Sequence, residues 1–137
     1  MTTGTLTPDL FDDYLARLTG APDEDGEPIP RDLPIHERWC RWERRNRAFY
    51  PIFRHFAFQL IGAGRAKIGA KAIVERVRWE VSVRTEGDPW KINNDYPAYY
   101  ARLFMAEHPE HDGIFETRCV GVEQPPEFYR LVLTERP

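Results

Sequence analysis

The sequence has little of the residues that mark metal, redox or secreted proteins. Its only cysteines are Cys40 and Cys119, and their spacing matches no metal or redox motif. The N-terminus shows no basic region followed by an apolar run, so we expect no secretory signal and no disulfide. There is also no run of about 18 apolar residues, so we expect no membrane span. These absences predict a cytoplasmic protein whose cysteines are small buried thiols.

Residues that carry catalysis are scarce as well. Ser82 is the only serine, and it stands in no nucleophile elbow. Glycines cluster at 62–69, but they follow a predicted helix rather than a strand, so they do not form a phosphate-binding loop of standard pattern. We therefore predict a protein that is not an enzyme and that uses no cofactor.

One group of side chains has the composition of a metal site. The ligand types are carboxylate, imidazole and thiol, at Glu107, His108, Glu110, His111, Asp112 and Cys119. Pro109 separates the two histidines where the predicted helix ends, and no second ligand pair stands at zinc-site spacing. We predict that this group is a solvated helix end and holds no metal.

Lysine is rare, with three in the chain, and charge is unevenly distributed. Residues 1–34 carry eight acids and two bases, whereas residues 35–91 carry thirteen bases and six acids. Residues 92–137 return to eight acids and four bases. A basic middle can bind phosphate, although the acidic ends of the same chain can also screen it.

The order of predicted elements indicates a winged helix-turn-helix. Apolar residues at helical spacing predict helices over 35–47, 50–64, 70–83 and 95–112, with a short strand at 65–69. Alternation of apolar and polar residues over 113–121 and 125–135 predicts a C-terminal β-hairpin. We therefore predict an α+β, helix-dominated winged-helix-like domain over residues 35–137. Residues 1–34 form an acidic extension with a short amphipathic helix and a Pro- and Gly-rich linker.

The N-terminal helix has an apolar face that must dock on something, because a helix this short is marginal alone. It can dock on its own domain, or it can anchor the chain in a groove of a protein partner. The residues predicted to bind such a partner are Leu10, Phe11, Tyr14 and Leu18.

Double-stranded DNA is the leading predicted ligand. In a helix-turn-helix the N-terminal part of the last helix enters the major groove. Basic residues would bind phosphate, and Asn and Arg can hydrogen-bond to base edges. The predicted contacts lie on the second and third helices of the helix-turn-helix and next to them: Lys67, Lys71, Arg76, Arg78, Lys91, Asn93, Asn94, Tyr96 and Arg102.

The same residues leave an alternative open. The third helix carries one base and several acids, and the predicted wing at 121–127 has two glutamates and no base. A module that binds a host or phage protein, through the N-terminal helix, the acidic wing or aromatic surfaces, is the second hypothesis. The sequence does not indicate an oligomeric state.

Two segments are similar to sequences known elsewhere: KAIVERVRWE at 71–80 and KINNDYPAYYARLFM at 91–105, closing on HPE at 108–110 and FETR at 115–118. Over about residues 39–118 the chain resembles a group of small phage- and prophage-encoded proteins. The resemblance implies a phage or prophage origin and a role in host takeover, regulation, exclusion or anti-defence in the bacterial cytoplasm. It implies no catalytic residues.

Overall fold

The computed structural model describes residues 5–20, 28–86, 90–117 and 122–137. These residues form six α-helices and one 3₁₀ helix: α1 (Pro8–Gly20), α2 (Ile35–Arg45), α3 (Phe49–Gly62), α4 (Ala70–Ser82), α5 (Tyr96–Glu107), η1 (Pro109–His111) and α6 (Pro126–Glu135). Within these ranges no strand forms, and the sheet-like pairing is a single parallel bridge between Ile68 and Phe115. The α+β winged-helix prediction is therefore wrong, because the described chain is helical.

The predicted C-terminal hairpin fails because its second arm is helix α6. Tyr129 and Val132, three residues apart, are buried, while Leu131 between them is 66% exposed. That pattern follows the 3.6-residue period of a helix rather than the two-residue period of a strand. Pro126 and Glu127 occupy the first turn of α6, where a missing N–H costs nothing and a carboxylate suits the helix dipole. In the other predicted arm, residues 113–117 make a single bridge at Phe115 and no strand, and residues 118–121 lie outside the described residues.

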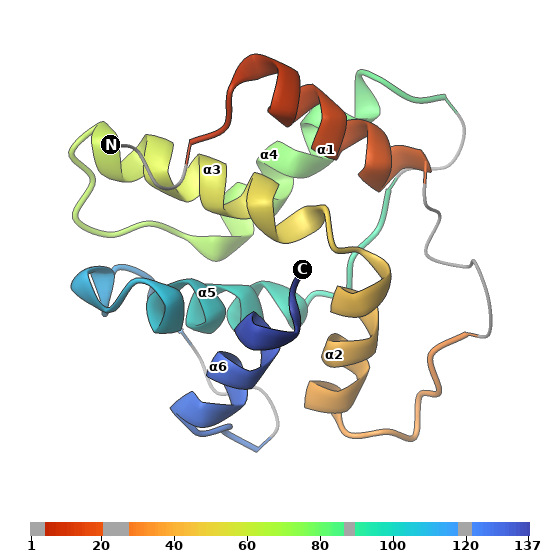
Figure 1. The fold of residues 1–137 in the computed structure, drawn as a ribbon, viewed down its shortest axis with the longest axis vertical. Coiled ribbons are helices and arrows are strands. Elements are labelled where there is room, and N and C mark those ends of the chain that lie inside the picture. The colour runs from red at the N-terminus through yellow and green to blue at the C-terminus, as the bar shows by residue number, and fades with distance from the viewer. Residues whose placement is uncertain (1–4, 21–27, 87–89, 118–121) are drawn as a thin grey trace.

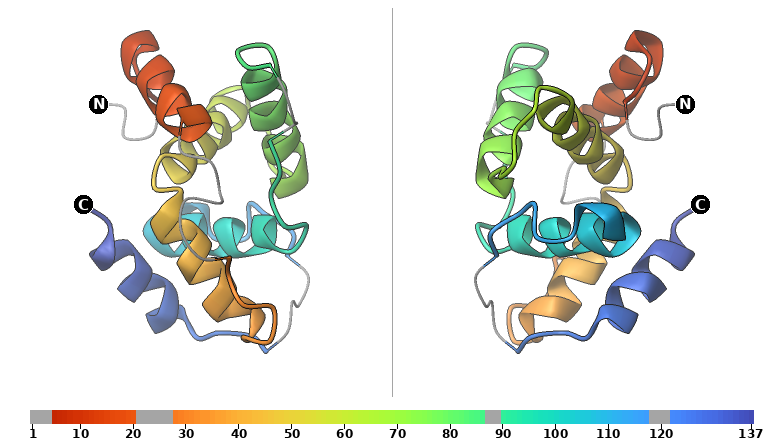
Figure 2. Two further views of the ribbon diagram at one scale, coloured as in Figure 1. Left: turned by 90° about the vertical axis from the view of Figure 1, so that its right-hand side faces the viewer. Right: turned by 90° about the vertical axis from the view of Figure 1, so that its left-hand side faces the viewer.

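Helix α5 is the central element of the fold. It contacts α2, α3, α4, α6 and η1. Figures 1 and 2 show it between α1, α3 and α4 on one side and α2 and α6 on the other. Its sequence, YPAYYARLFMAE, is apolar on nearly every face, which is typical of a helix surrounded by protein.

Aromatic rings fill the space around α5. The Tyr100 ring, fully buried, lies 4.7 Å from the Phe49 ring and 5.3 Å from the Trp39 ring, measured between centroids. Phe53 and Phe104 continue the cluster and both pack against Phe115. Aromatic packing of this kind joins α2, α3 and α5 into one core.

Helix α1 belongs to that core. Its Leu15 and Leu18 are buried, and the helix contacts α3 and α4. The Thr7 hydroxyl accepts a hydrogen bond from the Leu10 N–H at 3.3 Å, as expected of an N-cap. Nearby, the Leu6 N–H donates to Nδ1 of His55 at 2.9 Å, which ties the start of the helix to α3.

Candidate nucleic-acid interface

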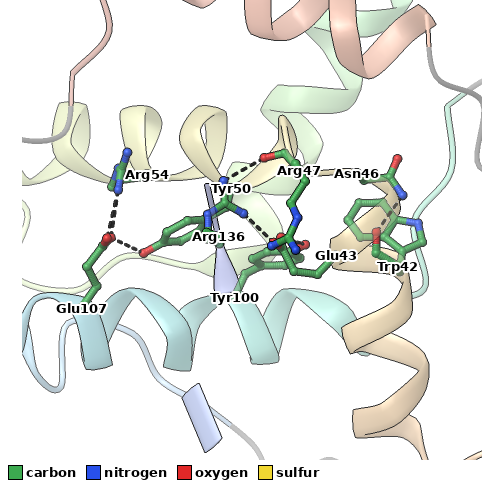
Figure 3. A network of polar contacts seen from close by, with 9 residues as sticks. All are labelled: Trp42, Glu43, Asn46, Arg47, Tyr50, Arg54, Tyr100, Glu107 and Arg136. Atoms are coloured by element: carbon green, nitrogen blue, oxygen red, sulfur yellow. Dashed lines mark hydrogen bonds and ion pairs between the residues drawn. The ribbon is translucent and has the colours of Figure 1, made fainter. Parts of the chain in front are cut away.

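A buried polar network fixes the relative positions of α2, α3, α5 and the C-terminal segment (Figure 3). Glu43 is 1% exposed, and its carboxylate accepts hydrogen bonds from the Tyr100 hydroxyl at 2.9 Å and from Arg136 at 2.5 Å. Arg47 completes the cluster 3.2 Å from the same carboxylate. Burial raises the pKa of Glu43, and the neighbouring guanidiniums and hydroxyl counter only part of that effect. The Glu43 carboxylate is almost fully buried, and its contacts join α2, α5 and the C-terminal segment.

A second carboxylate, Glu107, extends this network along α5. It accepts a hydrogen bond from the Tyr50 hydroxyl at 2.7 Å and two from Arg54 at 3.1 Å. Burial opposes ionisation of Glu107, but the Tyr50 hydrogen bond and the charges of Arg54 and His108 outweigh it, so the pKa is lowered from 4.5. Figure 3 shows Glu107 pointing at α3 rather than away from the protein.

Members of the possible metal group have contacts of other kinds. Glu107 is held by Tyr50 and Arg54, and the His108 ring packs 4.9 Å from the rings of Phe58 and Phe104. In the part of the chain that the structure describes, no group of three His, Cys, Asp or Glu side chains is placed to hold a metal ion. Cys119 lies outside that part.

Cys40 has little capacity for nucleophilic chemistry. It is half-buried on α2, and burial raises the pKa of its thiol to about 11. A thiol with that pKa stays protonated at neutral pH, and the thiolate is the reactive form.

Helix α5 cannot read bases as the sequence predicted. Over Tyr96–Glu107 every residue is buried or half-buried, so the helix offers no exposed face to a DNA groove. Tyr96 is 4% exposed. Arg102 is bound to Glu123, with a distance of 2.8 Å between the guanidinium and the carboxylate. Neither Tyr96 nor Arg102 is exposed as a base contact requires, because a central helix uses its side chains for packing.

Most of the other predicted DNA contacts do come together, in one surface groove. Three adjoining hollows, of about 430, 110 and 740 Å³, lie along the segment 91–98. Residues of α2 and α4 complete their lining. The first and second share Ile92 and Asn93, and the second and third share Lys71, Asn94 and Pro97, so the hollows are neighbours on the surface. We call this surface the basic groove. Its cationic lining residues are Arg31, Arg38, Arg45, Lys67, Lys71, Arg78 and Lys91.

Cationic side chains outnumber acidic ones in the lining of the basic groove. Its acidic lining residues are Glu75 and Glu116, and Glu75 pairs with Arg78. Among the described residues, no acid pairs with Lys71 or Lys91. Arginines elsewhere on the surface mostly do have carboxylate partners: Arg17, Arg44, Arg76, Arg84, Arg102 and Arg130.

Three arginines of the basic groove were not among the predicted contacts. Arg38 and Arg45 belong to the arginine-rich surface of α2, and Arg31 precedes that helix. The sequence signal for α2 is the arginine run itself, which is equally typical of a solvated helix face. What the sequence does not show is that α2 and the segment at 91–96 lie against one another through Trp42 and Tyr96, whose rings are 5.7 Å apart.

Arg76 is a predicted contact on α4 that does not line the groove. Its guanidinium pairs with Glu80 at 3.0 Å and sits 5.3 Å above the Phe56 ring, on the side of α4 that faces α3. It therefore serves as an internal control for the groove residues on the same helix.

The predicted partner-binding face of α1 is used mainly inside the protein. Leu18 is buried, and Phe11 and Tyr14 are half-buried. The Phe11 ring packs 5.0 Å from His55, whereas Leu10 is 46% exposed. The helix thus docks on its own domain, and this leaves little apolar surface for a partner groove.

Comparisons with models of known protein families, with characterised proteins and with solved structures gave no match for this chain. No helix in the described ranges is long and apolar enough to cross a membrane. The evidence about function therefore comes from the geometry of the chain itself.

Proposed function

We propose that the chain binds nucleic acid through phosphate groups held in the basic groove. The observation that carries the proposal is the set of three adjoining hollows, which are lined by seven Lys and Arg side chains and two acids. Phosphate contacts of this kind supply affinity and do not depend on sequence. Asn93 and Asn94, both exposed in the groove, can add hydrogen bonds to the backbone or to base edges.

Binding through phosphate groups and recognition in the major groove differ in how strongly affinity depends on the base sequence of the nucleic acid. Helix α5, which was predicted to enter the major groove and read base pairs, has no exposed residue. We therefore expect affinities that vary little among unrelated sequences and fall steeply with salt. The resemblance to small phage-encoded proteins, and a role in regulation or host takeover, remain predictions that the comparisons do not test.

Fluorescence anisotropy with labelled oligonucleotides tests the proposal. The variant is the double neutralisation Lys71→Gln/Lys91→Gln, and Arg76→Gln on the same helix is the matched control. Loss of two phosphate contacts should reduce the slope of log K against log salt by about 1.4 to 1.8. Arg76→Gln should leave the slope near that of the unaltered chain, because Arg76 does not line the groove.

Two results would overturn the proposal. One is the absence of any nucleic-acid affinity tighter than about 100 μM at about 0.15 M salt, since even non-specific binding would then be missing. The other is an equal effect of Arg76→Gln and of the groove variant, which would show that net charge and not the groove determines affinity. Either result would favour the second hypothesis, in which a cationic groove meets an acidic surface of a protein partner.

A further inference from the structure

Trp79 is the most conspicuous exposed side chain next to the basic groove. It is 62% exposed in the last turn of α4, whereas Ile73, Val74 and Val77 of the same helix are buried. A large aromatic ring left in water contributes nothing to the core. An exposed Trp beside a binding surface is therefore a candidate for contact with a ligand.

Helical spacing places Trp79 at the rim of the basic groove. It follows Glu75 by four residues, so the two side chains are neighbours along one face of α4. It also adjoins Arg78 in sequence, and both Glu75 and Arg78 line the groove. The indole therefore stands within one helical turn of the groove wall, on the side that faces solvent.

An aromatic ring at the rim of a cationic groove is the combination used to bind single-stranded nucleic acid. The cations follow the phosphates, and an unpaired base stacks on the ring. The bases of a duplex are already stacked on one another, so they cannot use an exposed indole in this way. Helix α5, the predicted recognition helix, has no exposed face with which to read a duplex through its major groove.

We propose that the basic groove takes single-stranded DNA or RNA, with phosphates along Lys71, Arg78 and Lys91 and one base stacked on Trp79. This inference rests on the function proposed above and specifies the form of the nucleic acid. Glu75 and Arg78 form an ion pair in the groove lining, so a bound phosphate would compete with Glu75 for the guanidinium.

The experiment compares a single strand of about 15 nucleotides with a hairpin duplex of similar total charge. The variants are Trp79→Ala and Trp79→Phe. Leu131→Ala is the matched control, because Leu131 is 66% exposed on α6 and lies outside the groove. Affinity is measured by anisotropy, and the intrinsic tryptophan emission is recorded in the same titration. Thermal unfolding checks that each variant retains the fold, as expected for substitutions at exposed positions.

We expect Trp79→Ala to weaken binding of the single strand roughly 5- to 150-fold, the effect of losing one stacked base. Trp79→Phe should retain most of the affinity, and Leu131→Ala should retain all of it. The salt dependence should stay unchanged in Trp79→Ala, since no phosphate contact is removed. Emission should be quenched on binding in the unaltered chain and much less in Trp79→Phe.

The failures of the two proposals are distinguishable. If Lys71→Gln/Lys91→Gln weakens binding while Trp79→Ala binds the single strand as tightly as the unaltered chain, the stacking inference is overturned and the groove stands. An equal loss for hairpin and single strand would also overturn it, because duplex bases cannot stack on the ring. If Trp79→Ala instead abolishes a concentration-dependent self-association, the ring is a protein contact and the inference fails. No binding of either nucleic acid overturns the function itself.

Discussion

The C-terminal Arg136 should stabilise the fold as strongly as a core residue, although it is the second-last residue of the chain. Chain ends usually tolerate substitution because they make few contacts. Arg136 is an exception: its side chain is 15% exposed and donates to the Glu43 carboxylate at 2.5 Å and to the Arg47 carbonyl at 2.8 Å. Its guanidinium also lies 5.2 Å above the Tyr50 ring.

The cost of Arg136→Ala can be estimated from these contacts. A hydrogen bond to a charged group contributes about 1.5 to 3 kcal/mol, and a desolvated cation–π contact adds about 1 to 2 kcal/mol. Removing one partner of a buried ion pair costs about 3 to 5 kcal/mol when the other charge is left alone. Here Arg47 and the Tyr100 hydroxyl still bind Glu43, so we expect about 2 to 4 kcal/mol.

Urea unfolding of the unaltered chain, Arg136→Ala and Arg130→Ala measures this cost. Arg130 is the control because it is also an arginine near the C-terminus, but its pair with Glu127 is 3.8 Å long and the Arg130 side chain is 65% exposed. Such a pair contributes at most about 1 kcal/mol. The expected loss at Arg136 corresponds to a fall in melting temperature of roughly 6 to 15 °C.

Stability measurements on Arg136→Ala can contradict this estimate. If Arg136→Ala costs no more than Arg130→Ala, the buried contacts do not stabilise the fold. A double-mutant cycle with Glu43→Gln should show that the two substitutions are not additive, because they remove the same interaction. In Arg136→Ala, lowering the pH should narrow the stability gap to the unaltered chain. Burial raises the pKa of Glu43, so the carboxyl with one partner removed can take up a proton and lose its charge.

Further predictions concern α1 and the titrating groups. Leu15→Ala should lower the free energy of unfolding by about 2 to 5 kcal/mol in urea titrations, whereas Leu10→Ala on the same helix should change it by less than about 1 kcal/mol. Burial lowers the pKa of His55 from 6.5, so the unfolded chain takes up a proton first and stability should fall as the pH drops below 6.5. That fall should be absent in His55→Gln. The pKa of Glu107 is lowered from 4.5, so its contribution should be present above that pH and disappear as the pH falls below it; Glu107→Gln should lack this acid-dependent loss. A flat profile for the unaltered chain over either pH range would contradict the corresponding assignment.

Helical periodicity predicted α1 to α5 well because each of those helices has apolar residues three and four apart. It failed at α6, where Tyr129, Leu131 and Leu133 also satisfy the alternation of a strand. The signals that could have decided the matter lie at the start of the segment, where Pro126 and Glu127 favour the first turn of a helix. When the apolar residues of a short segment fit both the helical and the strand period, the residues at its ends have to decide between helix and strand.

The composition of α5 indicates that the helix is enclosed by other parts of the protein. In a helix of twelve residues, Arg102 and Glu107 carry the charges, and both are bound to other parts of the protein. A helix with so little polar surface is enclosed by others, whereas a recognition helix needs a polar, exposed face. The order of helices alone does not distinguish these two cases.

The groove could not be derived from the sequence because its walls are far apart in the chain. Arg31 and Arg38 come from the region of α2, Lys91 from the segment before α5, and Lys67 and Lys71 from the start of α4. Their proximity depends on α2 and α4 both packing on α5, and no local pattern encodes that arrangement. The enclosed helix and the basic groove are therefore linked. Helix α5 packs inside the protein, so the charged side chains that can contact a ligand belong to the elements around it. Tests of function should therefore begin with the charged side chains of those surrounding elements.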